Sequence, residues 1–213
     1  MRAEPNTKRV VAFFDGQNLF HGAREAFGYT YPNYSPLALA ARVCGVQGFS
    51  LQQIRFYTGV PDRADNAFWS AFWSAKLLAM SRTGIVVFSR PLRYRNKEFR
   101  LPGGATFTRL VGEEKGIDVR LALDVIRMAR KNELDVALVF SQDDDLSEVA
   151  KEVRSLAQEQ ERWIKIASAF PVSPTSRNRR GINYTDWIPI DRATYDACLD
   201  PRDYRPKTPG AGP

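Results

Sequence analysis

The chain has 213 residues, of which 44% are hydrophobic, enough to bury one substantial core but too few for two full domains. The chain has 31 basic and 24 acidic residues, which give a net charge of +7. This excess of positive charge favours a polyanionic partner. One histidine and two separated cysteines exclude zinc sites, and no apolar run reaches the roughly 18 residues of a membrane span or forms a signal peptide. We therefore expect a soluble, cytoplasmic protein, with His21 on the surface and Cys44 and Cys198 reduced and buried.

Apolar runs and helical patterns alternate along the chain, which predicts an α/β fold with a mostly parallel sheet and helices on both faces. The expected strands span 10–14, 54–60, 85–88, 136–140 and 164–169. The expected helices span 19–27, 37–43, 64–81, 116–131 and 146–160. We expect a single domain over 9–200, with flexible tails at 1–8 and 201–213, because both ends are polar and rich in proline or glycine.

Two segments interrupt this alternation and combine basic with aromatic residues. Residues 91–110 are predicted to form a hairpin or extended arm around Pro102-Gly103-Gly104, and residues 176–187 form a second such segment. Because arginine binds phosphate and aromatic rings stack on unpaired bases, both could bind single-stranded nucleic acid. A solvated hairpin and a solvated loop explain them equally well. The predicted nucleic-acid-binding residues are Arg93, Arg95, Lys97, Arg100, Arg177, Arg179 and Arg180, with Tyr94 and Tyr184 as stacking partners.

An aromatic row with helical spacing lies in the third expected helix. A row of this kind could stack on bases, but its helical spacing favours a place in the core, with a homodimer interface as the second interpretation. Its members are Phe68, Trp69, Phe72, Trp73, Leu77 and Met80.

Acidic residues follow two of the expected strands. Asp15 ends the run 10–14, and Asp143 and Asp145 follow the run 136–140. Ligand sites of open α/β sheets lie outside the carboxyl ends of the strands, so these acids can converge there. Clustered carboxylates repel one another, and a hard cation such as Mg²⁺ or Mn²⁺ relieves that repulsion. The pattern predicts metal-assisted hydrolysis of a phosphate ester.

The helix expected at 116–131 carries two further aspartates. On a helical projection Asp118 falls within the apolar sector, where a charge requires a metal or another partner. Asp124 instead projects toward Arg120 and Arg127, and ion pairs along the helix explain it without function. We therefore favour Asp118 as a ligand and keep Asp124 in reserve.

Local structure offers other roles for some of these polar residues. Asp145 with Glu148 fits a helix capping box, which is the alternative role for Asp145. Asp143 is the least explained by local structure and, with Asp15, is the firmest functional prediction. Asn18 is expected either to cap the first helix or to hold Asp15 by hydrogen bonding.

Three short blocks around these acids resemble the NYN domain family, relatives of the PIN-domain nucleases, over about residues 9 to 170. The blocks are Phe14-Asp15-Gly16-Gln17-Asn18-Leu19, Lys115-Gly116-Ile117-Asp118-Val119 and Ser141-Gln142-Asp143-Asp144-Asp145-Leu146. The resemblance implies a PIN-like three-layer fold with about five strands in the order 3-2-1-4-5, so that Asp15 would face Asp143 and Asp145. This sequence departs from the family pattern in having Gln142 for a usual glycine, Leu146 for a usual phenylalanine, and Asp144 as an additional acid.

The resemblance also implies divalent-metal cleavage of RNA. It places Asp15, Asn18, Asp118, Asp143 and Asp145 in the catalytic site, with the four aspartates as ligands of Mg²⁺ or Mn²⁺. We predict a metal-dependent endoribonuclease; the alternative is an RNA-binding module with a structural or vestigial ion.

Two other enzyme classes fit the sequence poorly. A HAD-type phosphatase would need a second acid where this chain has Gln17, and an NTPase would need a Gly-Lys-Ser/Thr loop, which the sequence lacks.

Overall fold

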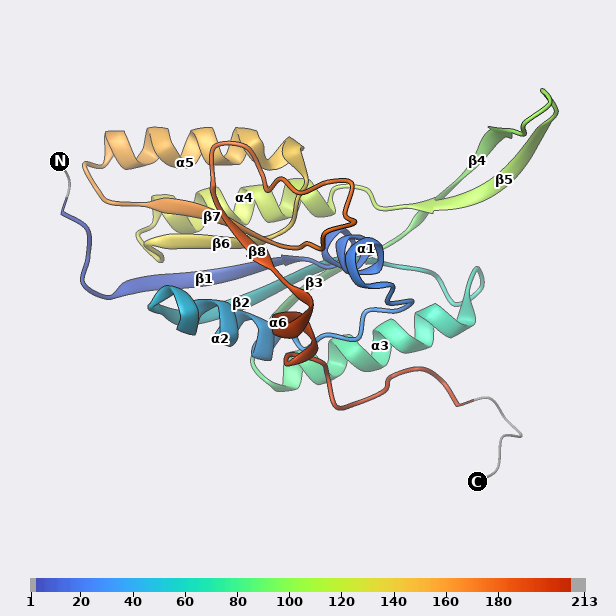
Figure 1. The fold of residues 1–213 in the computed structure, drawn as a ribbon, viewed down its shortest axis with the longest axis horizontal. Coiled ribbons are helices and arrows are strands. Elements are labelled where there is room, and N and C mark those ends of the chain that lie inside the picture. Colours follow the sequence, from blue (N-terminus) through green and yellow to red (C-terminus); the bar gives the residue numbers. More distant parts are fainter. Residues whose placement is uncertain (1–2, 208–213) are drawn as a thin grey trace.

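The computed structural model describes residues 3–207, in which a six-stranded sheet lies between two layers of helices (Figure 1). Every neighbouring pair of strands is parallel, and the spatial order is β3-β2-β1-β6-β7-β8. The strands are β1 (Lys8–Asp15), β2 (Phe49–Val60), β3 (Val86–Pro91), β6 (Val136–Phe140), β7 (Lys165–Pro171) and β8 (Asp186–Ile190).

The sheet has six strands rather than the five that we predicted. The five predicted strands lie in the expected relative order, and β8 adds a sixth at the edge beside β7. Its start falls within the segment 176–187 that we interpreted as a binding loop. Pro189, the fourth of the five residues of β8, made this strand hard to predict, because proline has no N–H to donate to a neighbouring strand. Proline is tolerated on an edge strand such as β8, which has a neighbour on one side only.

The helices lie on both faces of the sheet, as the alternating pattern predicted. In Figure 1, α4 and α5 cover the upper face, and α2 and α3 cover the lower face. The helix α6 was not predicted; it has only five residues, too few for a periodic signal, and Asp191 caps it by accepting from the Thr194 backbone N–H at 2.8 Å. The helices are α1 (Gly16–Phe27), α2 (Pro36–Gln47), α3 (Ala67–Arg82), α4 (Ile117–Arg130), α5 (Ser147–Glu159) and α6 (Arg192–Asp196), with a 3-10 turn η1 (Asp144–Leu146) before α5.

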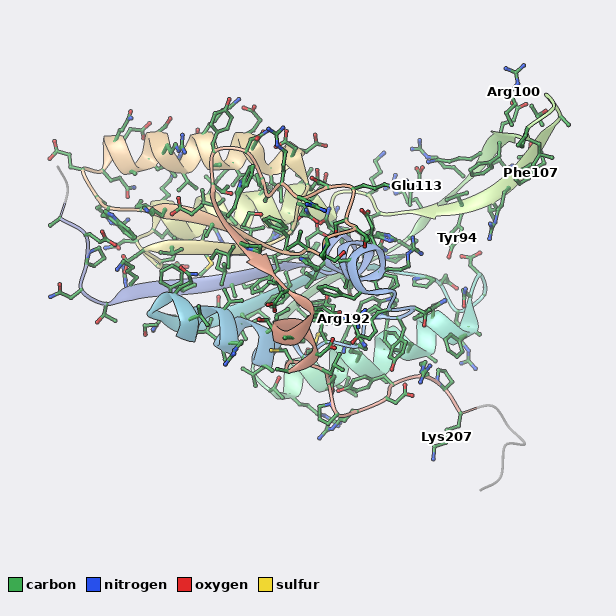
Figure 2. The ribbon with its side chains drawn as sticks, in the orientation of Figure 1. Tyr94, Arg100, Phe107, Glu113, Arg192 and Lys207 are labelled. Atoms are coloured by element: carbon green, nitrogen blue, oxygen red, sulfur yellow. The ribbon has the colours of Figure 1, made fainter. Side chains whose placement is uncertain are left out.

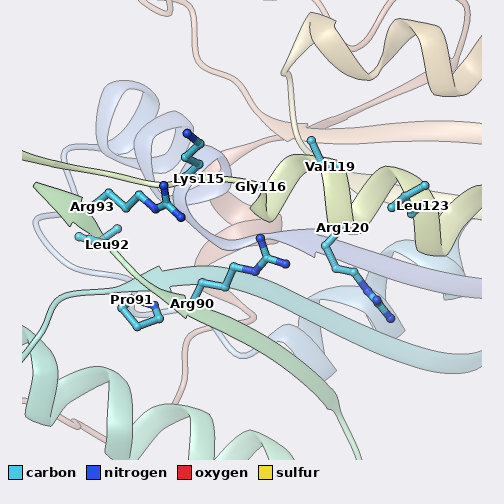
Figure 3. Close-up of a pocket in the computed structure, with 9 residues that line it drawn as sticks. All are labelled: Arg90, Pro91, Leu92, Arg93, Lys115, Gly116, Val119, Arg120 and Leu123. Atoms are coloured by element: carbon cyan, nitrogen blue, oxygen red, sulfur yellow. The ribbon is translucent and has the colours of Figure 1, made fainter.

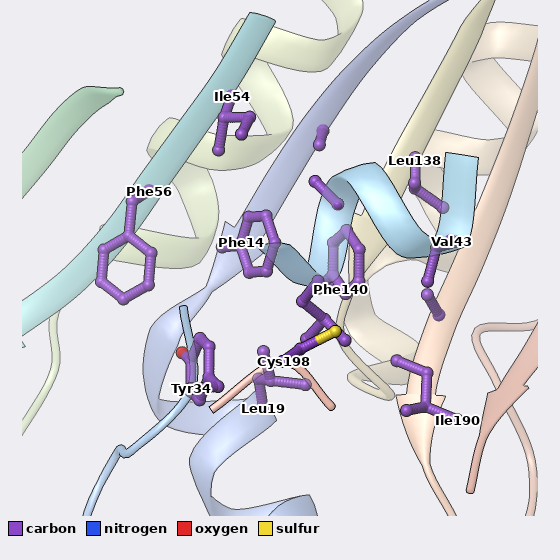
Figure 4. Close-up of a cluster of buried hydrophobic side chains, with 14 of the residues drawn as sticks. Phe14, Leu19, Tyr34, Val43, Ile54, Phe56, Leu138, Phe140, Ile190 and Cys198 are labelled. Atoms are coloured by element: carbon purple, nitrogen blue, oxygen red, sulfur yellow. The ribbon is translucent and has the colours of Figure 1, made fainter. Parts of the chain in front are cut away.

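Two hydrophobic clusters, one on each face, hold the layers together. Val10 and Phe14 of β1 face the cluster with α1, α2 and α3, and Val11 and Phe13 face the cluster with α4 and α5. Alternate residues of a strand point to opposite faces, so a central strand buried on both faces is apolar throughout. The Phe14 and Phe140 rings stack with centroids 4.0 Å apart directly beneath the strand ends (Figure 4). This packing fixes the ends of β1 and β6 beside each other.

The aromatic row of α3 belongs largely to the core, as predicted. Phe72, Trp73, Leu77 and Met80 are buried, whereas Phe68 is exposed and Trp69 is partly buried. Trp69 and Trp73 of the row also line a pocket described below.

Residues 91–110 were predicted to form a hairpin or arm, and the structure confirms a hairpin. Strands β4 (Arg93–Arg100) and β5 (Thr106–Glu113) pair antiparallel and form the arm, which extends away from the sheet (Figure 1). Figure 2 shows Arg100 and Phe107 near its tip and Tyr94 and Glu113 near its base.

The chain ends and the cysteines complete the description. Part of each predicted tail, residues 1–2 and 208–213, lies outside the described residues; in the described part β1 begins at Lys8, and the Tyr204 ring packs against Phe72. Cys44 and Cys198 are buried and unpaired, as expected. None of the helices in residues 3–207 is long and apolar enough to cross a membrane.

Candidate functional site

The junctions that follow β1 and β6 lie side by side at one edge of the sheet. Phe14 pairs with Phe140 in the register of these strands, so Asp15 and Ser141 are the next residues on each side. The Ser141 hydroxyl donates a hydrogen bond to Asp15 Oδ2 at 3.1 Å and accepts one from the Asp143 backbone N–H at 3.1 Å. The structure therefore joins Asp15 to the loop that carries Asp143, as expected from their positions after neighbouring strands.

Asp15, and not Asn18, caps the first helix. Asp15 Oδ1 accepts from the Asn18 backbone N–H at 3.1 Å, and the Asn18 side chain accepts from the Gln142 backbone N–H at 2.8 Å. Of the two roles predicted for Asn18, capping of α1 is therefore wrong, whereas Asn18 does hold Asp15 by hydrogen bonding, through its backbone N–H. The Asn18 side chain links the start of α1 to the loop after β6, which fixes the two junctions relative to each other.

Asp15 is a buried acid in a field of other acids. Burial raises its pKa to about 6, against two hydrogen bonds that lower it, and the charges of Asp143 and Asp118 raise it further. Only 7% of the Asp15 surface is exposed. The ionised form is therefore costly in the absence of a nearby cation.

Glu114 belongs to the same cluster and was missed in the sequence. Burial raises its pKa to about 7, with the charges of Asp15 and Asp118 acting in the same direction. Its carboxylate accepts a hydrogen bond from the Gly59 backbone N–H. Glu114 directly precedes the Lys115-Gly116 block, which was the available signal in the sequence. It was missed because a glutamate next to another glutamate, Glu113, is typical of a solvated surface. Its burial arises from contact with β2, more than fifty residues away in sequence.

The two aspartates of α4 have the opposite placement from our prediction. Asp118 is exposed in the first turn, whereas Asp124 is buried on the stripe shared with Leu121 and Met128. Asp124 is bound by Arg55 of β2 at 3.0 Å, and Tyr57 donates to it at 2.8 Å.

The predicted ion pairs of Asp124 along α4 are present, with Arg120 at 3.1 Å and Arg127 at 3.2 Å. Hydrogen bonds from Tyr57 and Arg120, together with the charge of Arg55, lower the pKa of Asp124 despite its burial. Asp124 is therefore a structural acid, and Asp118 is the α4 acid near Asp15.

The capping box predicted for Asp145 and Glu148 is not formed. Asp143 caps the turn η1, because its carboxylate accepts from the Asp145 backbone N–H at 3.1 Å, and no side chain caps α5. Glu148 instead pairs with Lys151 at 2.6 Å. Asp145 itself is exposed in η1. Asp143 thus has a local role as well as a place in the acid cluster.

Two of the three unusual residues of the third block, Gln142 and Asp144, hold the arginine-rich segment against the site. The Gln142 side chain donates to the Arg180 carbonyl at 2.9 Å, and Asp144 accepts from the backbone and side chain of Asn183 at 3.1 and 2.8 Å. These contacts fix the backbone of the segment and leave the predicted arginine side chains exposed: Arg177, Arg179 and Arg180.

The remaining predicted binding residues are distributed along the arm. Arg95 and Lys97 both pair with Glu113 on the opposite strand, whereas Arg93 lies at the base and Arg100 near the tip (Figure 2). The structure therefore does not gather all seven predicted basic residues into one patch. Tyr184, predicted as a stacking residue, has Lys151 and Arg154 over its ring at 5.1 and 5.5 Å.

An aromatic pocket of about 300 Å³ opens near the start of α1. Phe20 and Gln17 of α1, Trp69 and Trp73 of α3, and Tyr94 of the arm contribute to its wall. Aromatic faces with an amide at the rim suit a flat, partly polar group such as an unpaired base.

The acids of the cluster do not form a complete set of metal ligands in this conformation. Among residues 3–207, no three histidine, cysteine, aspartate or glutamate side chains form a group that could hold a metal ion. Four direct aspartate ligands, as we predicted, are therefore not assembled in this conformation.

The fold of this chain is similar to that of a solved structure. A solved structure of a protein of unknown function from Vibrio parahaemolyticus is similar in fold, with a TM-score of 0.51 and 18% sequence identity over 92% of this chain and 99% of that chain. MurG from Acinetobacter baumannii matches with a TM-score of 0.33, 9% identity and coverage of 85% and 45%. At that TM-score the likeness supports no conclusion about this chain. No curated protein matches the chain.

The family comparison covers the same part of the chain as the three blocks. The NYN domain model matches residues 9–172, a span that includes β1, α4 and the turn η1 and hence all the acids described above. The chain therefore belongs to the NYN domain family of PIN-like nucleases.

Proposed function

We propose that this protein is a metal-dependent endoribonuclease. The observation that carries the proposal is the cluster of Asp15, Glu114, Asp118 and Asp143, in which burial and the charges of the neighbouring acids raise the pKa of both Asp15 and Glu114. Within residues 3–207, no ion pair joins any of these four acids to a basic side chain. A divalent cation is the partner that such a cluster lacks.

The donor set fits Mg²⁺ or Mn²⁺. Both ions prefer oxygen ligands, and Mg²⁺ in particular usually keeps several waters and takes one or two carboxylates together with substrate phosphate. That mode of binding requires no complete protein cage. Asp15 and Asp143 would hold the ion, with Asp118 and Asp145 acting directly or through water. When bound, the ion would lower the pKa of a water molecule and stabilise charge on the phosphate.

The side chains around the acids have positioning roles in this proposal. Ser141 orients Asp15 and the Asp143 backbone together, and Asn18 ties α1 to the same loop. Glu114, with a pKa of about 7, can accept or release a proton near neutral pH. It is our candidate for the group that takes the proton from the attacking water.

RNA as the substrate is supported by charge and by the shape of the surroundings. The chain has a net charge of +7, and exposed arginines flank the acids on the segment 176–187. The aromatic pocket that Tyr94 shares with Trp69 lies near the start of α1 and suits an unpaired base. A single strand could therefore be held by its phosphates and bases on either side of the acids.

The test is a cleavage assay on single-stranded and structured RNA, with a DNA strand for comparison. Cleavage should require Mg²⁺ or Mn²⁺, stop with EDTA and be lost in Asp143→Asn. Glu148→Gln is the control, because Glu148 is a nearby exposed acid that pairs with Lys151 and has no contact with the acid cluster or the arginine-rich segment among the interactions of residues 3–207; this variant should still cleave. Cleavage that persists in EDTA, or in a folded Asp143→Asn protein, would contradict the metal mechanism. RNA binding without cleavage under any metal would favour the second function, an RNA-binding module.

A further inference from the structure

A basic pocket of about 620 Å³ lies beside the acid cluster, between the end of β3 and the start of α4 (Figure 3). Four of its nine lining residues are basic and none is acidic. The basic residues are Arg90, Arg93, Lys115 and Arg120. Arg93 alone was among the predicted binding residues, and the other three come from segments that showed no basic cluster in the sequence.

Three of the four cations have no acidic partner in the part of the chain that the structure describes. Arg120 is paired with Asp124, but within residues 3–207 no ion pair involves Arg90, Arg93 or Lys115. Cations that share one cavity repel one another, and an anion bound among them removes this cost. The pocket is therefore complementary to a ligand with at least one negative charge.

The guanidinium groups of Arg90 and Arg120 are held in place by one aromatic ring. Both lie over the ring of Phe88, at 5.2 and 5.5 Å from its centroid. Within residues 3–207 the Arg90 guanidinium has no ion pair and presents paired N–H donors that match the oxygens of a phosphate, whereas the Nε and Nη2 groups of Arg120 donate to Asp124 at 3.2 and 3.1 Å. Lys115, which also lines the pocket and lies beside Arg93 in Figure 3, adds a further positive charge.

Gly116 keeps the Arg90 side chain in this position. Its φ is +72°, a conformation that favours glycine, and a Cβ at this residue would lie 2.7 Å from Arg90 Nη1. Any other residue would be strained in this conformation, and the end of the Arg90 side chain would have to shift to make room for its Cβ. Glu114 and Asp118 flank the Lys115-Gly116 pair in the chain, so the pocket adjoins the acids of the candidate site.

We propose that this pocket binds a phosphate group of the nucleic-acid strand. The identity of this ligand rests on the proposed function, in which the nucleic-acid strand is the substrate cut at the neighbouring acids. A terminal phosphate and an internal phosphodiester share the chemistry that the pocket recognises. Because the pocket lies beside the acids, a phosphate bound in it would position the strand so that the bond to be cut reaches the acids. The arginines of the pocket would not touch the reacting atoms.

The experiment measures RNA binding by fluorescence anisotropy in EDTA, so that metal-dependent cleavage does not interfere. A short single strand labelled at its 3′ end is used with either a 5′-phosphate or a 5′-hydroxyl. Arg90→Gln combined with Lys115→Gln should weaken binding by about 10-fold or more, since charged hydrogen bonds to phosphate are removed. The slope of log affinity against log salt should fall by about 0.7 for each phosphate that the variant no longer neutralises. Arg93→Gln, at an exposed position, should act in the same direction.

The matched control is Arg130→Gln combined with Lys131→Gln, which removes two charges at the opposite end of α4. A loss of affinity confined to the 5′-phosphorylated strand would assign the pocket to a terminal phosphate, and an equal loss for both strands would assign it to an internal one. An affinity and salt slope equal to those of the control would overturn the proposal. Competition by poly-glutamate as strong as that by RNA would also overturn it, in favour of an acidic protein partner. This binding experiment does not require cleavage. Its outcome is therefore independent of the Asp143→Asn cleavage assay, which tests the proposed nuclease function.

Discussion

Asparagine in place of Asp15 should stabilise the metal-free protein at pH 8 and have a much smaller effect at pH 4. Asp15 is buried, and its pKa is raised from 3.8 to about 6 in the folded protein. Between these values the folded protein binds more protons than the unfolded chain. Stability is therefore lost as pH rises from about 4 to about 7, and the penalty is complete above that range.

The magnitude follows from the pKa difference between the two states. At about 1.4 kcal/mol per pH unit, ionised Asp15 costs the folded protein about 3 kcal/mol at pH 8. An asparagine keeps the acceptor for the Asn18 N–H, and the Ser141 hydroxyl can rotate to accept from its amide. For a chain of this size the gain corresponds to roughly 6–12 °C in melting temperature.

The assay is urea unfolding of wild type and Asp15→Asn at pH 4 and pH 8, in EDTA. Asp124→Asn is the internal control, because Asp124 is also buried but Tyr57, Arg120 and Arg55 lower its pKa. Its stabilisation is present at pH 8 and lost as pH falls, so Asp124→Asn should destabilise the protein most at pH 8. An effect of Asp15→Asn that is the same at both pH values would refute the reasoning.

Three further predictions concern metal and RNA. Millimolar Mg²⁺ or Mn²⁺ should raise the melting temperature through binding to the folded state, and Asp143→Asn should diminish the rise; a melting temperature indifferent to both ions would count against a metal site. Tyr94→Ala should weaken single-stranded RNA binding by about 1–3 kcal/mol in an anisotropy titration, and Tyr94→Phe should not, because the ring face and not the hydroxyl stacks on a base. Replacing Arg177, Arg179 and Arg180 together with alanine should lower RNA affinity and its salt slope while leaving the metal-induced melting shift intact; unchanged affinity would make the segment a solvated loop.

Much of the framework could be predicted from the sequence. The continuous apolar run of β1 indicates a strand buried on both faces, and the alternation of strands with helices indicates a parallel sheet. Acids directly after such strands must lie at one edge of the sheet, which is why Asp15 and Asp143 were found without the structure. The arm was also predictable, because proline and glycines interrupt a basic and aromatic stretch.

Tertiary structure alone decided which acids are buried and what each one contacts. On α4 the helical pattern pointed to Asp118 rather than Asp124 as the inward-facing acid, because it could not show that Arg55 of β2 lies beside Asp124 and makes its burial tolerable. Glu114 joins the cluster through β2, and the basic pocket forms because β3, the arm and α4 meet. Charge and burial at these positions depend on segments distant in sequence, since the field at a carboxylate is set by everything folded around it.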